Sequence, residues 1–185
     1  HRFPGGHTWL AAIRGDAEAL ARAQAFLQDR VVSVDIAAAR VEGGAEHPLA
    51  RGVELRPGQR VIFDVVVRNT GTGHNFPGGT RDAQDTIVEL LLEGAEGRPL
   101  ATPAEPHRLG AAMIDEQGTP QWAREIERLR AVGYDHTIAP RDARVVRFSV
   151  DVPEGMSDRP VKVIARVVHR SRTEALREAT CAEAR

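Results

Sequence analysis

Four stretches of the sequence alternate apolar and polar residues with a period of two, which is the pattern of half-buried β-strands. They lie at 32–36, 61–67, 146–152 and 161–167, and residues 86–92 form a further strand candidate. Turn signals separate them, and the sequence of a turn followed by an alternating strand recurs at 57–68 and 140–152. A doubly wound α/β fold would need helices between most strands, and they are missing. The sequence therefore predicts an all-β fold, an antiparallel immunoglobulin-like β-sandwich.

A few segments depart from the strand pattern. Residues 1–15 are rich in Gly, Pro and His and predict an irregular arm, followed by a helix from the N-cap Asp16 to about Gln28. Thr119 and Pro120 predict the start of a second short helix, with Trp122, Ile126 and Leu129 on its apolar face. The predicted organisation is an N-terminal arm and helix over 1–30, a β-sandwich over 31–172 and a C-terminal tail over 173–185 that can form a short helix.

Composition narrows the classes of function. The formal net charge of −1 gives no electrostatic reason to bind a nucleic-acid backbone, and no apolar run is long enough for a transmembrane segment. Cys181 is the one cysteine, so these residues contain no disulfide, no CxxCH haem attachment site and no multi-cysteine zinc site. Hydrolase motifs are missing, and Asp82, Asp85 and Glu89 beside Arg81 are read as a salt-bridged loop. No catalytic residue is therefore predicted.

The hexapeptide His-x-Phe-Pro-Gly-Gly occurs twice, at 1–6 and 74–79. Proline fixes φ, paired glycines permit a left-handed backbone and a close approach, and the phenylalanine can anchor the loop by packing. Such a loop can present an imidazole to a metal or a flat cofactor. The candidate binding residues are His1, Phe3, His7, His74, Phe76, Gly78 and Gly79. The alternative is a hairpin loop whose histidine only bonds a backbone carbonyl.

The remaining histidines allow a second kind of site. His1, His7 and His74 together would supply three nitrogens for a mononuclear zinc or copper site, with His136 as a fourth candidate. His47, His107 and His169 are expected at the surface or at strand edges. A third interpretation is an immunoglobulin-like module that binds a protein or a glycan through exposed aromatic residues.

Residues 65–82, which read VVVRNTGTGHNFPGGTRD, resemble a segment of the C-terminal domains of multihaem c-type cytochromes. That segment has the pattern N-x-G-x-G-H-x-[FL]-P-[TG]-G and belongs to the cytochrome c-554-like group, some of whose members carry tetratricopeptide repeats. The strands at 86–90 and 163–170 fit the same pattern, and residues 1–6 resemble the segment shortly after the last CxxCH of such proteins.

This resemblance implies a function that the residues alone do not. In that family an upstream, exported region binds the haems through CxxCH motifs. The resemblance therefore implies haem c in a parent protein. Either residues 1–30 continue the haem-bearing region, or the chain is a haem-free relative. The implied role is a non-catalytic accessory domain for electron transfer, periplasmic or extracellular. Its implied partners are the haem-bearing region or another cytochrome. His1 and His74 are the implied distal ligands of haem iron, or contacts to a neighbouring haem.

Overall fold

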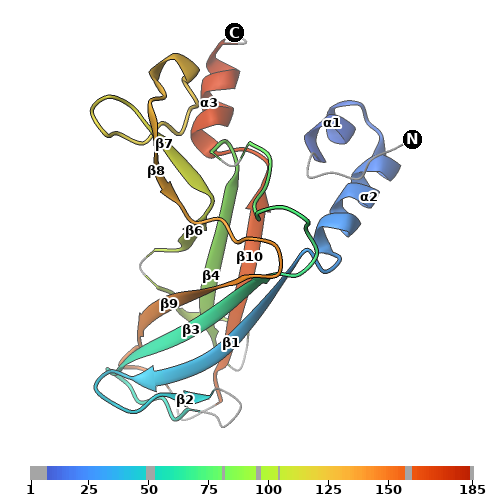
Figure 1. Ribbon diagram of the computed structural model, residues 1–185. Helices are drawn as coiled ribbons and strands as arrows, with labels where there is room; N and C mark the ends of the chain where they lie inside the picture. The colour runs from blue at the N-terminus through green and yellow to red at the C-terminus, as the bar shows by residue number, and fades with distance from the viewer. Residues whose placement is uncertain are drawn as a thin grey trace.

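The structure is a computed structural model that describes residues 8–48, 53–80, 82–94, 97–103, 105–156 and 160–183. Two antiparallel sheets pack face to face, and a hairpin and three helices lie toward one end (Figure 1). The first sheet has the order β2 (His47–Pro48), β1 (Val32–Val41), β3 (Arg60–Asn69) and β9 (Ala143–Asp151). The second has the order β10 (Lys162–Arg170), β4 (Asp85–Glu93) and β5 (Pro99–Ala101), with β6 (His107–Leu109) also paired to β4. The hairpin joins β7 (Ala111–Ile114) to β8 (Ala131–Asp135).

The alternating residues form the core between the two sheets. Val61, Phe63, Val65 and Val67 of β3 are at most 1% exposed, and Phe63 lies opposite Phe148 of β9. Leu90 and Leu92 of β4 are buried in the same cluster from the other sheet. Because side chains alternate across a strand, the residues between them lie on the outer face of each sheet, where β3 places the charged Asp64 and Arg68 and the half-buried Ile62 and Val66. The prediction of a mostly-β fold with antiparallel sheets is thus confirmed.

The helices lie at the edges of the sandwich and bury no residue fully. These are α1 (Thr8–Ile13), α2 (Ala17–Gln28) and α3 (Glu174–Glu183). The prediction for α2 is confirmed, since the Asp16 carboxylate accepts the N–H of Ala19 at 2.9 Å, and Thr173 caps α3 in the same way through Leu176. The prediction of an irregular arm is wrong for residues 8–13, which form α1. The Gly, Pro and His residues that favoured an arm lie mainly in residues 1–7, outside the described part. No helix of the described residues has both the length and the apolar character to cross a membrane.

The predicted helix from Thr119 is wrong. The carboxylate of Asp115, which is 6% exposed, accepts the N–H groups of Gln117 and Thr119, both at 2.9 Å, and so holds the chain in a loop. Pro120 then forms a bridge with Ile114, and only a 3-10 turn follows at Ile126–Arg128. Trp122 therefore packs against Tyr134 and Arg108 instead of lining a helix.

Candidate functional site

The loop that carries His74 follows β3, and Asn69 at its base holds it in shape. Asn69 is 1% exposed, and its Nδ2 donates to the carbonyl oxygens of His74 at 2.8 Å and of Ile138 at 3.1 Å. Its Oδ1 accepts the N–H of Thr72 at 3.1 Å and the hydroxyl of Thr72 at 2.7 Å. One buried amide thus satisfies four polar groups, which fixes the loop backbone around His74.

A second set of contacts clamps the loop to the turn before β9. Phe76 and Ile138 exchange backbone hydrogen bonds, each 2.8 Å, and both side chains are buried. The N–H of Arg141 donates to the carbonyl of Asn69 at 3.0 Å. Phe76 therefore anchors the loop in the core, as the hexapeptide pattern led us to expect, and the Phe76–Pro77 peptide is cis.

The imidazole of His74 is exposed at the surface of this loop. Its Nδ1 lies 2.8 Å from the carbonyl oxygen of Asn75. A carbonyl can only accept, so Nδ1 carries the hydrogen and Nε2 of the neutral ring keeps a lone pair. No described residue bonds Nε2. The bond between Nδ1 and a backbone carbonyl is the contact expected of a purely structural histidine. Nε2, in contrast, carries no hydrogen in this tautomer, and an imidazole nitrogen of this form can bind a metal.

Gly78 makes room for this ring. A Cβ atom at Gly78 would lie 2.3 Å from Cε1 and 2.4 Å from Nδ1 of His74, far inside contact distance. Gly79 has a φ of 68°, a conformation that glycine adopts without strain. The two glycines of the hexapeptide therefore have separate roles, one steric and one conformational.

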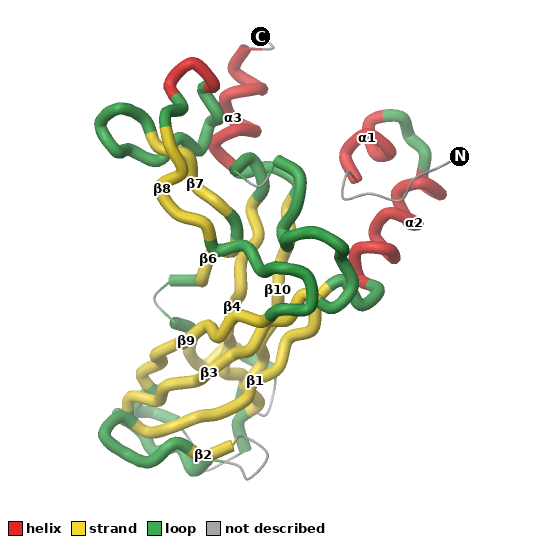
Figure 2. The backbone as a smooth tube through the Cα atoms, viewed as in Figure 1, coloured by secondary structure: helices red, strands yellow, loops and turns green. Residues whose placement is uncertain are grey.

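The loop joins β3 to β4 and lies between the base of α2 and the start of α3 (Figure 2). At one end, the hydroxyl of Thr70 donates to the carbonyl of Arg30 at 2.8 Å, and a Cβ at Gly71 would lie 2.3 Å from that same oxygen. At the other end, the carbonyl of Ala83 accepts the N–H of Thr173 at 2.8 Å. The helices thus flank the loop, and the His74 loop lies at the end of the sandwich where α2 and α3 attach.

Of the other predicted site residues, His1, Phe3 and His7 lie outside the described residues, so the three-histidine metal site stays a prediction. The described residues contain no group of three or more His, Cys, Asp or Glu side chains arranged for a metal. His136 instead stacks on His107, with ring centroids 5.4 Å apart and planes 7° apart. The two rings are parallel and do not converge on one point.

His107 lies on the edge strand β6, as predicted, but its ring is half-buried. Its Nε2 is buried without a hydrogen-bond partner among the described residues. Burial, with the neighbouring His136 and Arg144, lowers the pKa of His107. His47 is exposed on β2, and His169 pairs with the hydroxyl of Thr86 at 2.7 Å.

Asp82, Asp85 and Glu89, for which the sequence predicts a salt-bridged loop, do form ion pairs. Their partners are arginines distant in the sequence. Asp82 meets Arg124 at 3.1 Å, and Glu89 meets Arg166 at 2.6 Å. Asp85 meets Arg108 at 2.7 Å and Arg170 at 3.2 Å. Arg81 itself lies outside the described residues.

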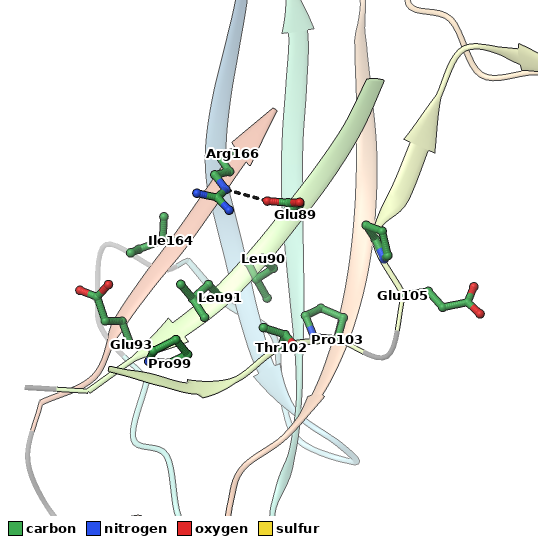
Figure 3. Close-up of a pocket in the computed structure, with 11 residues that line it drawn as sticks. Glu89, Leu90, Leu91, Glu93, Pro99, Thr102, Pro103, Glu105, Ile164 and Arg166 are labelled. Carbon is green, nitrogen blue, oxygen red and sulfur yellow. Dashed lines mark hydrogen bonds and ion pairs between the residues drawn. The ribbon is translucent and has the colours of Figure 1, made fainter. Parts of the chain in front are cut away.

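A hollow of about 580 Å³ lies on the outer face of β4 and β10, toward the far end of β4 from the His74 loop (Figure 3). Leu91, Ile164 and Pro103 supply apolar walls, and the Glu89–Arg166 ion pair crosses one side. Glu105 and Glu93 also line the hollow, and Glu93 pairs with Lys162 at 3.9 Å, so the lining has more acidic than basic residues.

The aromatic platform expected of a protein- or glycan-binding module is not formed by the described residues. Trp122 and Tyr134 pack on one another with ring centroids 6.4 Å apart. Trp9 lies under the guanidinium of Arg172, 4.6 Å from the ring centroid. All three residues are half-buried, and their rings pack against other residues of the chain.

No protein-family model matches the sequence, and no curated protein matches it. Among solved structures, the fold is similar to that of a penta-heme cytochrome c552 from Thermochromatium tepidum. The TM-score is 0.59 at 17% sequence identity, over 85% of this chain and 36% of that one. The chain thus spans about a third of the cytochrome's length. At this identity the likeness concerns the fold alone, and it places the chain among folds found within multihaem cytochromes.

Proposed function

We propose that this chain is a non-catalytic accessory domain of an exported multihaem cytochrome c, which packs against haems and lends His74 as an axial ligand. The observation that carries the proposal is the geometry of His74, an exposed residue whose Nδ1 lies 2.8 Å from the Asn75 carbonyl oxygen, which leaves Nε2 without a bond to any described residue. The fold shared with part of a penta-heme cytochrome supports it.

The described residues fit a haem. An axial histidine needs a neutral imidazole nitrogen directed at the iron and an acceptor that holds its other nitrogen. His74 and Asn75 supply both, and the missing side chain of Gly78 leaves the space that the imidazole occupies in this orientation. Haem iron would supply the one-electron chemistry, whereas the chain's own residues hold the imidazole and its tautomer.

The proposal extends to features that follow from the resemblance. His1, with Phe3 and His7 nearby, would present the second copy of the hexapeptide to a haem. The partner would be the haem-bearing region or another cytochrome, in the periplasm or outside the cell, and the sandwich would be of the immunoglobulin-like kind. Haem c would belong to the parent protein and not be attached covalently to these residues.

A haem c peptide with one proximal histidine and an open sixth position tests the role of His74. Added to the chain, this ferric peptide should change from high spin to low spin, seen as a Soret and visible absorbance change. His74→Ala should abolish the change and added imidazole should restore it, whereas His47→Ala, an exposed histidine on β2, should leave it intact. An unchanged titration in His74→Ala would refute His74 as the ligand.

A further inference from the structure

Three non-glycine residues of the described chain have a positive φ, and all three are arginines. They are Arg30 at 54°, Arg124 at 61° and Arg141 at 62°. This left-handed conformation disfavours a side chain such as arginine, and glycine or asparagine would adopt it more readily. Strained residues cluster at functional sites, so their shared location is informative.

Each of these arginines is fixed to the segment that carries His74. The carbonyl of Arg30 accepts the hydroxyl of Thr70 at 2.8 Å, and the N–H of Arg141 donates to Asn69 at 3.0 Å. Arg124 reaches Asp82, beyond the hexapeptide, at 3.1 Å. The three come from different parts of the fold, namely the α2–β1 junction, the loop before β8 and the turn before β9.

Two of the three have an unneutralised charge. Arg124 is paired with Asp82, whereas Arg30 and Arg141 are exposed and form no ion pair with any described carboxylate. The adjacent Asp142 turns its carboxylate to the N–H of Ala143, at 2.8 Å. Arg30 and Arg141, which have no ion-pair partner among the described residues, are therefore bonded through their backbones to Thr70 and Asn69, at the base of the His74 loop.

We propose that Arg30 and Arg141 bind the propionate carboxylates of the haem that His74 contacts. A guanidinium presents a planar fork of donors that matches a carboxylate, and a haem has an apolar plane with two carboxylates on one edge. A requirement for positive charge at these two positions would explain why arginine stands at both despite its strained backbone. This inference rests on the proposed function and deepens it by assigning residues to the anionic edge of the ligand.

The test compares a haem c peptide with free propionates and the same peptide with both propionates esterified. Arg30→Asn and Arg141→Asn keep a residue that tolerates a left-handed backbone while removing the charge. Each should weaken binding of the free-acid peptide about fivefold and leave binding of the ester unchanged. Arg56→Asn, in the turn before β3 and paired with Glu54, is the matched control and should change neither affinity.

The outcomes separate the two proposals. Low-spin binding that depends on His74 but is indifferent to esterification and to both arginine variants overturns the propionate contacts alone. Binding that does not depend on His74 overturns the proposed function as well. Thermal melts of the variants verify folding, and they should be no lower than that of the parent, because asparagine relieves the backbone strain.

Discussion

At the scale of single residues, Asn69 determines the shape of the His74 loop. Asn69→Ala would remove one hydrogen bond each from the carbonyls of His74 and Ile138, and it would leave the N–H of Thr72 without its acceptor. The two carbonyls keep a second donor, the Thr72 hydroxyl and the Phe76 N–H respectively. We expect the free energy of unfolding to fall by about 2–4 kcal/mol, since each lost hydrogen bond contributes about 0.5–1.5 kcal/mol and an unsatisfied buried group costs about 1–3 kcal/mol.

Urea unfolding followed by circular dichroism measures this loss. Asn75→Ala is the matched control, because its one side-chain bond, to Thr137, is exposed, and its effect should stay within about 0.5 kcal/mol. Equal effects of the two variants would show that Asn69 has no special part in holding the loop.

Gly78 belongs to the same scale, because its missing side chain decides where the imidazole lies. In Gly78→Ala the new methyl group would lie 2.3 Å from Cε1 and 2.4 Å from Nδ1 of His74, so the ring must shift, and we expect it to lose its bond to Asn75. Long-range ¹H–¹⁵N NMR should show the His74 tautomer shifting from Nδ1–H toward Nε2–H. Gly73→Ala, where a Cβ meets nothing within 4 Å, should keep the parent spectrum. A parent-like spectrum in Gly78→Ala would contradict the steric role.

At the scale of elements, the stacked His107 and His136 join β6 to the end of β8. The pKa of His107 is lowered from its ordinary value of 6.5 by burial first, then by His136 and Arg144. The unfolded chain therefore takes up a proton at a higher pH than the folded chain. The stability that neutral His107 supplies is complete above pH 6.5 and is lost as the pH falls below that value.

His107→Phe should remove this part of the pH dependence while keeping a ring against His136. Unfolding free energies measured from pH 7 down to about pH 5, above the range in which most carboxylates titrate, should fall less steeply for the variant than for the parent. His47→Gln, on the exposed β2, should keep the slope of the parent. Identical slopes for His107→Phe and the parent would exclude His107 as the group responsible.

The elements also show what the sequence could predict. Strands such as β3 and β9 follow from local alternation, and α2 follows from its Asp16 cap. The segment after Thr119 has good helix signals, but a buried carboxylate at Asp115 captures its backbone, and no local pattern reveals that burial. For the candidate site, the hexapeptide predicted His74, Phe76 and both glycines, and the structure places them in one loop. The partnership of Asn69 with Ile138 joins residues 69 positions apart and requires the fold.

At the scale of the whole molecule, the sandwich serves as a rigid support for one end. The two sheets bury a continuous apolar core, and the His74 loop is fixed to the bases of α2 and α3 and to the turn before β9. The acidic hollow on β4 and β10 lies toward the other end of β4. This separation leaves the His74 end, with Arg30 and Arg141, as the surface where we propose that a haem binds.

The most direct test asks whether a nitrogen of His74 is bonded to haem iron. The chain, with its histidines labelled with ¹⁵N, is mixed with an unlabelled ferric haem c peptide, and pulsed electron paramagnetic resonance measures the nitrogen couplings to iron. We predict a ¹⁵N coupling that disappears in His74→Ala and persists in His47→Ala. A low-spin complex without ¹⁵N coupling, or a coupling that survives His74→Ala, would contradict the account.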